Sequence, residues 1–456
     1  MVFQPSRSLD ANTHYTFRLS DGVKDESGVA FLPFSTTFST GSNDNSNSAI
    51  RFNKSTVYTG IGPLGFSSLE TSPDGTQLYG ATITGELHRW TIAADGRLTN
   101  QQTFLGLANA NRSIVGLVFD PQDPKTLWIT NNDSVVTPPP ANDFTSKISK
   151  VTLNSGSSFV PTVTDYVVGL PRATRSHMSN SLEFGPDGAL YLTQGGNAAT
   201  GAPDSNWGNR PERLLTASVL RIDPRRTAPV GGFNVQTETY NGKPGTYNPF
   251  APNAPVTLYG KGIRNAYDLV WHSNGSLYVP NNGSGAAEGN TPDDPRTPFN
   301  EVLLGVNTQN DYLYRVESGG YYGHPNPAQG HYILNGGNPT AGLDPAEVNQ
   351  YAVGTQPDPL YRGFAYDFGR NRSTNGAIEY LGDAFGGKLR NQLLVTEYSA
   401  GDDILALKLG ANGGVIGSTQ IASGLNNPLD LVEHRPTGNL YVSEFGANQI
   451  SLLSVV

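Results

Sequence analysis

The sequence predicts an all-β protein and, within that class, a six-bladed β-propeller. A short hairpin pattern recurs along the chain: an apolar strand, a turn rich in Pro, Asp, Asn and Gly, and a second strand that ends in Leu and an aromatic residue. The chain also contains 53 Gly, 32 Pro, 21 Tyr and 19 Phe, a composition typical of strands joined by turns. Six copies of the hairpin at a mean spacing of about 70 residues indicate six four-stranded blades.

The clearest copy of the hairpin lies between Ser176 and Thr193. Leu182 and Phe184 alternate with Glu183, which is the period-two pattern of a strand. The Pro-Asp-Gly turn that follows supplies a fixed φ, a side chain that caps its own turn and a residue that accepts positive φ. The other copies run over Leu69–Tyr79, Leu117–Trp128, Leu269–Tyr278, Leu431–Tyr441 and, more weakly, Gly387–Tyr398.

The two ends of the repeated region predict how the ring closes. The last strand, Ile450 to Val456, is expected to pair with the strand near Val57, so that the final blade takes strands from both ends of the repeat region. A sandwich of two sheets, or two smaller β domains, is the alternative architecture for the same pattern.

Residues 1–41 are interpreted as a partial Ig-like β domain, residues 42–49 as a linker and residues 50–456 as the propeller. Strands are expected from Tyr15 to Leu19 and from Phe34 to Thr40, and this stretch resembles the last strands of a bacterial Ig-like surface domain. A complete domain of that type needs about seven strands and about 100 residues, so the pattern predicts a fragment, with further Ig-like domains upstream. A decorated N-terminal arm is the alternative.

Charge and composition exclude several classes of function. The formal net charge is −9 and no run of Lys and Arg occurs, which disfavours nucleic-acid binding because that affinity requires a basic surface. No apolar run approaches the ~20 residues that span a membrane. Cysteine is absent, so disulfides and thiolate metal sites are excluded. We expect a bacterial protein that is secreted or displayed at the cell surface, with a carbohydrate or another small molecule as its partner.

Five motifs occur in an order that points to a family. The hairpin after His177 is followed by SVLRIDP (218–224), YNPF (247–250), YGKGIRNAYDLVWHSNGSLYVPNNG (259–283) and GGYYGHPNP (319–327). This order resembles the soluble glucose/sorbosone dehydrogenase family, six-bladed propellers that use pyrroloquinoline quinone and calcium. The resemblance covers about residues 50–456. It implies a secreted enzyme that oxidises a sugar hydroxyl with the quinone cofactor and calcium.

The resemblance also assigns roles to residues. It makes His177 the general base that takes the proton of the sugar hydroxyl, a task suited to imidazole at neutral pH. It makes Arg264 and Asn265 the residues that contact the quinone. It places calcium on the loop of Asn281, Asn282 and Gly283, mainly through backbone carbonyls, which suit a hard cation. The structural alternatives are a loop histidine bonded to backbone, an arginine paired with a carboxylate of a neighbouring blade, and an ordinary turn.

Aromatic and histidine side chains in the long loops are candidates for substrate binding. Trp207 could stack on the apolar face of a pyranose, and Tyr322 and His324 could line the same face of the ring. The alternative for Trp207 is a loop anchor that inserts into the core.

The sequence departs from the family where the anionic quinone needs cations. The expected Lys falls near Tyr398 and Ser399, and the expected pair of Arg falls near Asn427 and Leu429, so no cation stands at these positions. Unpaired carboxylates are costly to remove from water. The alternative function is therefore a non-catalytic propeller that has lost the quinone site and binds a glycan or a surface partner. A polysaccharide lyase or hydrolase is a further alternative, which would use the nearby carboxylates Glu397, Asp402, Asp403 and Glu444.

Overall fold

The computed structural model describes residues 50–60, 65–134, 141–154, 158–285, 289–297 and 301–456, residues 24 and 28, and the backbone of residues 14–19 and 34–39. The chain divides into two compact units, Met1–Ile50 and Arg51–Val456. In the first unit, β1 (His14–Leu19) and β2 (Phe34–Ser39) pair antiparallel. Both strands predicted in this stretch are confirmed to within one residue, while the Ig-like assignment, the upstream domains and the linker remain predictions.

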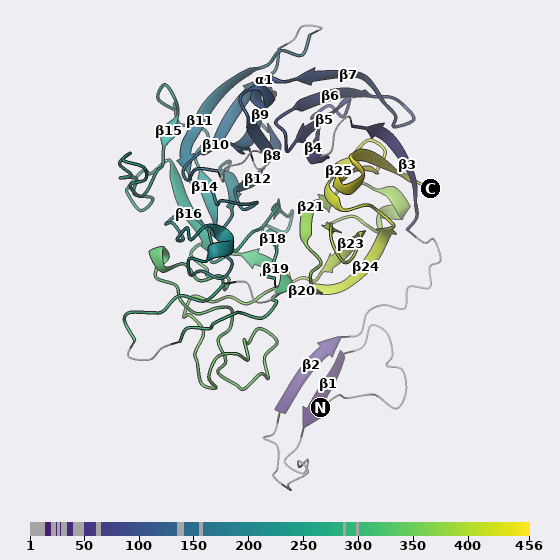
Figure 1. Cartoon of the computed structure of the whole chain (residues 1–456). Coiled ribbons are helices and arrows are strands. Elements are labelled where there is room, and N and C mark those ends of the chain that lie inside the picture. Colours follow the sequence, from purple (N-terminus) through teal and green to yellow (C-terminus); the bar gives the residue numbers. More distant parts are fainter. Residues whose placement is uncertain are drawn as a thin grey trace. The chain divides into compact units, whose positions relative to one another are not determined.

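The second unit is a ring of six sheets, as predicted (Figure 1). The first blade contains β4 (Phe66–Thr71), β5 (Gln77–Thr82), β6 (Leu87–Ile92) and β7 (Leu98–Phe104). The second contains β8 (Arg112–Asp120), β9 (Asp123–Asp133), β10 (Ser146–Thr152) and β11 (Thr162–Leu170), and β15 (Phe233–Asn234) pairs with the outer side of β11. The third contains β12 (Ser179–Phe184), β13 (Leu190–Gln194), β14 (Ser218–Ile222) and β16 (Val256–Lys261).

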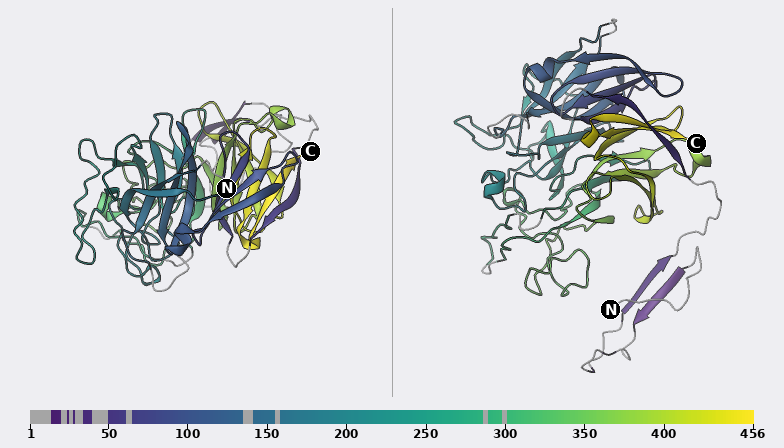
Figure 2. Two further views of the ribbon diagram at one scale, coloured as in Figure 1. Left: turned by 90° about the horizontal axis from the view of Figure 1, so that it is seen from above. Right: turned by 45° about the vertical axis from the view of Figure 1, so that its right-hand side comes forward.

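The remaining three blades follow the same plan. They contain β17 (Val270–Trp271), β18 (Leu277–Asn281), β19 (Asn310–Val316) and β20 (Tyr366–Arg370); β21 (Thr374–Tyr380), β22 (Gln392–Glu397), β23 (Asp403–Leu409) and β24 (Val415–Ser423); and β25 (Pro428–His434), β26 (Asn439–Glu444), β27 (Gln449–Val455) and β3 (Phe52–Thr59). The helices are single turns: α1 (Gly106–Asn109), η1 (Ser205–Trp207), η2 (Pro327–Gln329), η3 (Ala384–Gly387) and η4 (Phe445–Ala447). Figure 2 shows the strands running between the two faces of the ring.

Five of the six predicted hairpins form the two innermost strands of a blade, as in β12 and β13. The sixth prediction, Gly387–Tyr398, is wrong in its first strand. Only β22 is a strand between Gly387 and Tyr398. Its hairpin partner is β21, with the sequence TNGAIEY, which begins thirteen residues before Gly387. The inner strand was missed because eleven residues separate it from β22, including the short helix η3, so the two strands do not share a tight turn.

The ring closes as predicted. Strand β27 pairs antiparallel with β3, which is the first strand of the ring in sequence, with Ser451 opposite Thr56. Lys54 of β3 reaches Glu444 at 2.8 Å, and Glu444 is buried. The Tyr58 ring packs at 4.9 Å from Trp90 of the first blade. Pairing with β3 therefore covers the edge of β27, and contacts such as that of Tyr58 join the last blade to the first.

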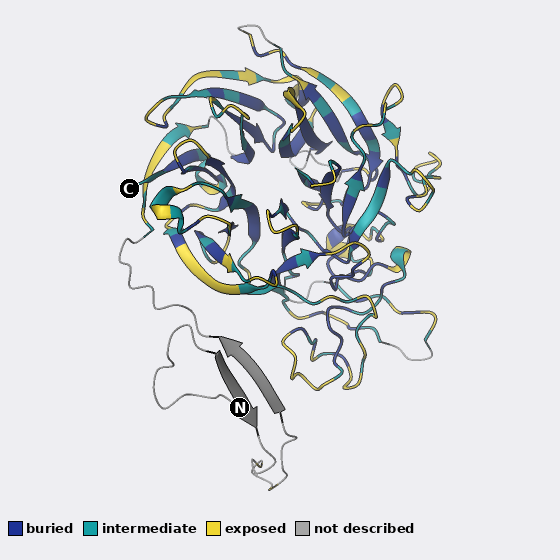
Figure 3. Ribbon diagram, turned by 180° about the vertical axis from the view of Figure 1, so that it is seen from behind, coloured by how far each residue is buried: buried dark blue, intermediate teal, exposed yellow. Residues whose placement is uncertain are grey.

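Burial follows the distance from the ring axis (Figure 3). The inner strands are mostly buried, whereas the outermost strands β3, β7 and β24 are largely exposed. Apolar side chains of neighbouring blades form shared clusters, such as the one that joins Trp128 of the second blade to Leu192 of the third. Buried carboxylates add hydrogen bonds between blades, because Asp268 accepts from the backbone N–H of Ala377 at 2.9 Å.

Four carboxyl groups on the inner strands, or just before one of them, interact electrostatically with one another. They are Glu70, Glu183, Asp268 and Asp430. Glu70 and Glu183 border a cavity of about 680 Å³ at the channel end formed by the hairpin turns. Burial, with the charge of Asp268, raises the pKa of Glu183 to about 8, and burial raises the pKa of Asp268 to about 6. Folding therefore favours the protonated forms of these groups.

This protonation predicts how stability depends on pH. A carboxyl group whose pKa is raised on folding stabilises the protein fully below its unfolded pKa, and that stabilisation is lost as the pH rises through the folded pKa. For Glu183 the interval runs from about 4.5 to about 8. We expect the free energy of unfolding to fall over this interval and to fall less in Glu183→Gln, as measured by denaturant titration. Glu317→Gln, at an exposed position, is the control, and identical slopes for Glu183→Gln and the wild type would contradict the prediction.

Candidate functional site

The loops before the inner strands of the third and fourth blades meet at one end of the ring. His177 lies two residues before β12, Gly196 follows β13, and Arg264 lies between β16 and β17. We call this end of the ring the His177 face. The loop of His177 wraps around Arg172, whose buried guanidinium donates to the carbonyl oxygens of Ala173 at 2.8 Å and His177 at 3.2 Å.

The imidazole of His177 is buried and held in one orientation. Its Nδ1 lies 2.8 Å from the carbonyl oxygen of Gly196, and because a carbonyl only accepts, Nδ1 carries the proton and Nε2 the lone pair. Burial, together with the positive charge of Arg264, lowers the pKa of His177 well below its usual range. The side chain is therefore neutral at neutral pH, which is the protonation state a general base requires.

Trp207 lies inside the protein rather than on its surface. The ring is 4% exposed, its centroid is 4.0 Å from that of His177, and the guanidinium of Arg264 lies 5.8 Å away. The structure thus differs from an open sugar-stacking surface and agrees with the core-anchor alternative. Trp207 also brings His177 and Arg264 together, because both side chains contact it.

Tyr322 is likewise a core residue. It is 1% exposed and belongs to the apolar cluster between the third and fourth blades. Its hydroxyl donates to the carbonyl oxygen of Arg315 at 2.9 Å and accepts from the N–H of Glu317 at 2.7 Å. These bonds hold the long connection after β19 in place and engage the hydroxyl of Tyr322, whose role in substrate binding stays a prediction.

Arg264 and Asn265 point to different neighbours. The Nε of Arg264 donates to the carbonyl oxygen of Ala199 at 2.8 Å, and Nη1 donates to that of Gly283 at 3.0 Å. Asn265 accepts instead from the side chain of Asn180 at 3.0 Å. The two adjacent residues therefore link the loops of the His177 face and do not form a single clamp for one ligand.

The predicted calcium loop already contacts a cation of the protein. Its carbonyl oxygens at Asn282 and Gly283 lie 3.5 and 3.0 Å from Nη1 of Arg264, and the side-chain oxygen of Asn281 accepts from a backbone N–H at 3.0 Å. In the described part of the chain no group of three or more His, Cys, Asp and Glu side chains is suited to a metal ion. Because a guanidinium stands where the hard cation was expected, the donor set does not fit calcium.

The residues also do not fit an anionic quinone. Asn427, at one of the expected cation positions, donates through its side chain to the carbonyl oxygen of Tyr398 at 2.8 Å. Lys388 and Arg390 cannot replace the missing cations, because they lie between β21 and β22, at the opposite end of the ring from His177. The guanidinium of Arg264 is engaged by backbone carbonyls. At these positions the three carboxylates of the quinone would therefore lack the ion pairs that offset their desolvation.

The carboxylates considered for lyase or hydrolase chemistry have structural partners. Glu444 accepts from Lys54 at 2.8 Å and from the N–H of Asn426 at 2.7 Å. Asp402 accepts from the N–H of Asn427 at 3.0 Å. Glu397 and Asp403 are cross-strand neighbours, and burial, with Asp403 beside it, raises the pKa of Glu397 to about 8. This last pair lies at the ends of the two middle strands of the fifth blade.

The long connection after β19 carries His324 to the His177 face. The connection after β19 runs back along the outer strand β16, where Lys261 and Tyr321 form a parallel bridge and the N–H of His324 donates to the carbonyl oxygen of Gly262 at 2.8 Å. His324 then meets Glu212, with Nε2 at 2.9 Å from the carboxylate. Sequence reasoning missed Glu212, since only the folded connection brings it beside the GGYYGHPNP motif.

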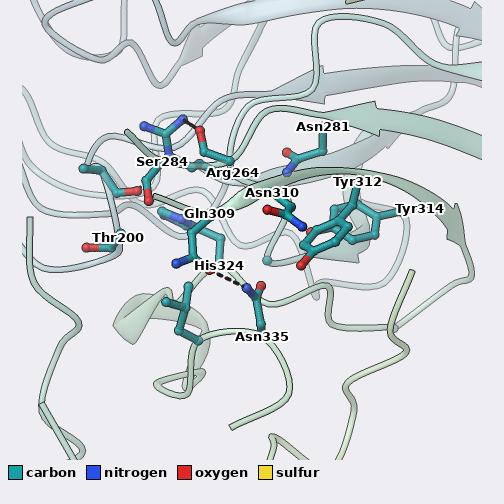
Figure 4. Close-up of a pocket in the computed structure, with 14 residues that line it drawn as sticks. Thr200, Arg264, Asn281, Ser284, Gln309, Asn310, Tyr312, Tyr314, His324 and Asn335 are labelled. Atoms are coloured by element: carbon teal, nitrogen blue, oxygen red, sulfur yellow. Dashed lines mark hydrogen bonds between the residues drawn. The ribbon is translucent and has the colours of Figure 1, made fainter. Parts of the chain in front are cut away.

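His324 borders a small inner cavity (Figure 4), and a second, outer cleft shares part of its lining. The inner cavity, bordered by Arg264, Ser284 and His324, has about 20 Å³ of space for water centres, about enough for one water. The outer cleft is larger, about 300 Å³, and its lining is rich in amide side chains: Asn307, Gln309, Asn310, Asn335, Asn349 and Gln350. We call this space the amide cleft. The sequence showed these amides only as loop composition, so they were missed as a possible site.

Hydrogen bonds within the amide cleft orient its side chains. Asn335 donates to Gln309 at 2.8 Å (Figure 4), and Gln309 donates to the carbonyl oxygen of Asn307 at 2.7 Å. The ring of Tyr312 lies stacked on Phe364, with centroids 4.4 Å apart. The cleft therefore has a pre-arranged polar wall and a fixed aromatic side chain.

The fold and the site define a six-bladed propeller with a buried histidine face and a polar cleft beside it. No known protein-family model matches the chain. None of the helices in the described part of the chain is long and apolar enough to cross a membrane.

Solved structures with a similar fold include sugar dehydrogenases. A glucose dehydrogenase superposes with a TM-score of 0.60 at 13% identity, over 89% of this chain and 100% of the other. The soluble aldose sugar dehydrogenase of Escherichia coli in its apo-form gives 0.57 at 17% identity, over 89% and 99%. The PQQ-bound aldose sugar dehydrogenase of Streptomyces coelicolor gives 0.54 at 14% identity, over 89% and 99%. At these identities the likeness establishes a sugar-dehydrogenase-like propeller fold.

Proposed function

We propose that the protein binds a neutral carbohydrate at the amide cleft, on a propeller like that of the sugar dehydrogenases but without their quinone and calcium. The observation that carries this proposal is the lining of the cleft, in which amide side chains predominate. An amide group both donates and accepts hydrogen bonds, as sugar hydroxyls do. Of the two charged side chains that border the cleft, Glu347 already accepts from the N–H of Thr340 at 2.9 Å. Secretion or display at the cell surface is part of the same proposal.

A calorimetric titration of the full chain with glucose, methyl glucoside and cellobiose tests this function. We expect heat of binding with at least one of these neutral sugars, and weaker binding in Asn335→Ala, which removes an amide from the cleft wall. The absence of binding by the wild type to all three would overturn the proposal. Asn349→Ala serves as the second cleft variant, so that a folding defect in one variant does not decide the result.

Quinone-dependent oxidation of a sugar is the second candidate function, and His177 favours it. Its neutral imidazole and fixed Nδ1 bond provide a proton acceptor at Nε2. The donor set described above argues against the quinone itself. We therefore expect an absorbance titration with pyrroloquinoline quinone and calcium to show weak or no binding, and glucose oxidation to be low or absent. If oxidation is observed, His177→Ala should abolish it while the variant still melts cooperatively, at a lower temperature because a buried side chain has been removed.

A further inference from the structure

The side chain of Glu212 is a buried anion with a full set of donors. It has no exposed surface. Its oxygens accept from the N–H groups of Asn197 and Ala198 at 2.9 Å each, from the hydroxyl of Thr216 at 2.5 Å and from Nε2 of His324 at 2.9 Å. Burial raises the pKa of Glu212, but its hydrogen bonds, first the one from His324, outweigh burial, and its pKa lies below the usual range. The carboxylate is therefore ionised at neutral pH.

The ionised carboxylate fixes the tautomer of His324. A carboxylate only accepts, so Nε2 of His324 must carry a proton. In the neutral imidazole, Nδ1 then holds the lone pair and acts as an acceptor. This Nδ1 is buried and has no hydrogen-bond partner among the described residues. A Cβ at Gly196 would lie 3.1 Å from Nε2 and 3.0 Å from Glu212, so glycine leaves the room that the pair occupies.

The unpartnered Nδ1 belongs to a residue that lines the inner cavity. Ser284 borders the same cavity, and its hydroxyl oxygen is also buried without a partner in the described part of the chain. A buried polar group left without a hydrogen bond costs about 1–3 kcal/mol. Two such groups beside a space that admits about one water point to a small polar ligand group there.

The inner cavity adjoins the amide cleft. Four residues line both spaces: Gln309, Asn310, Tyr312 and Asn335. These shared side chains form the wall between the two cavities. A ligand in the cleft has to pass one hydroxyl through this wall to contact His324 and Ser284.

We propose that His324, positioned by Glu212, accepts a hydrogen bond from one hydroxyl of a carbohydrate bound in the amide cleft. Ser284 supplies a second hydrogen bond to the same hydroxyl. This inference rests on the proposed function and adds the residue that hydrogen-bonds to the innermost hydroxyl of the carbohydrate. The ligand-contacting histidine is thus His324, whereas His177 is packed against Trp207 and does not border either cavity.

His324→Gln tests the acceptor separately from the fold. The glutamine amide can still donate to Glu212 in place of Nε2, but it does not reproduce an acceptor at the position of Nδ1. We expect affinity for the neutral sugar that binds the wild type to fall about tenfold or more, with the melting temperature close to that of the wild type. Ser284→Ala should weaken the same affinity by a smaller factor.

His331→Asn is the matched control. His331 is also a buried histidine paired with a carboxylate, with Nδ1 at 2.7 Å from Asp358 and an unpartnered Nε2. It borders neither cavity. Asparagine retains a donor toward Asp358, so sugar affinity is expected to stay unchanged. Equal sugar affinity in His324→Gln and the wild type would overturn the role of His324 while leaving the proposed function standing.

Imidazole nitrogen spectra give a test that does not need an identified ligand. Long-range ¹⁵N–¹H spectra of the wild type should show His324 protonated at Nε2 and not at Nδ1. Addition of glucose, methyl glucoside or cellobiose should shift the Nδ1 resonance of His324 and leave that of His331 in place. A Nδ1–H tautomer, or no shift at a sugar concentration that saturates binding, would overturn the inference. Absence of sugar binding to the wild type would refute the proposed function and this inference with it.

Discussion

Removal of residues 51–60 is expected to abolish the folded propeller. Strand β3 is the outer strand of the last blade, and it pairs with β27 from Phe52 to Thr59. Without it, β27 exposes a row of unpaired backbone groups, and Glu444 loses Lys54. Tyr58 no longer covers Trp90 and Phe66 of the first blade. We expect a loss of more than about 5 kcal/mol, comparable with the total stability of a typical domain.

Two truncated chains make this measurement interpretable. A chain that begins at Arg51 should melt within a few degrees of the full chain, because the propeller unit begins at that residue. A chain that begins at Gly65 should show no cooperative transition in thermal melts followed by circular dichroism and tryptophan fluorescence. A cooperative melt of the shorter chain at the temperature of the longer one would refute the role of β3 in closing the ring. A lower melting temperature for the chain from Arg51 would argue against the predicted linker.

Arg264→Ala is expected to destabilise the propeller by about 1–3 kcal/mol, because buried carbonyl oxygens are left without their hydrogen-bond donor. The substitution leaves the carbonyl oxygens of Ala199, Asn282 and Gly283 without this donor. Arg264 is only 8% exposed, so water replaces it poorly. Arg264→Lys should cost less, because an ammonium group can reach some but not all of these oxygens. Unfolding in denaturant, measured for all three proteins, checks the order.

The response of the melting temperature to calcium tests whether Arg264 occupies the place of the ion. The melting temperature of the wild type should not change with added calcium or with a chelator, because the guanidinium already holds the loop carbonyls. Arg264→Ala should regain part of its stability in calcium, since freed carbonyl oxygens suit a hard cation. A wild-type melting temperature that rises with calcium and falls with chelator would show that the loop binds the ion despite Arg264.

The fold is that of the sugar dehydrogenases, whereas the residues of the candidate site do not fit their cofactors. The ring of six blades is the fold of the soluble sugar dehydrogenases, and His177 is a neutral, buried histidine at one end of that ring. The polar groups that a quinone and calcium need are neutral here or engaged by the protein's own backbone. A carbohydrate requires neither cofactor for binding, which is why the amide cleft carries the proposed function.

Local sequence pattern was sufficient for the architecture. The alternation around Leu182 and the Pro-Asp-Gly turn predicted the hairpin of β12 and β13, because strand faces and tight turns depend on residues close together in sequence. Repetition of that hairpin predicted six blades, and the apolar strand after Ile450 predicted the closure with β3. The weak copy at Gly387 failed where an eleven-residue connection, including a short helix, replaced the tight turn, so no local signal marked β21.

The candidate site depended on contacts that no local pattern encodes. Sequence order alone placed His177, Arg264 and the loop of Asn282 in one region, and the structure brings them to one face. Only the folded chain decided that Arg264 donates to the loop carbonyls, that Trp207 is buried against His177, and that His324 meets Glu212 across 112 residues of sequence. The sequence by itself determined the ring, since blades arise from periodic local signals. Tertiary structure alone decided which polar atoms remain for a ligand, because each donor's partner comes from a loop distant in sequence.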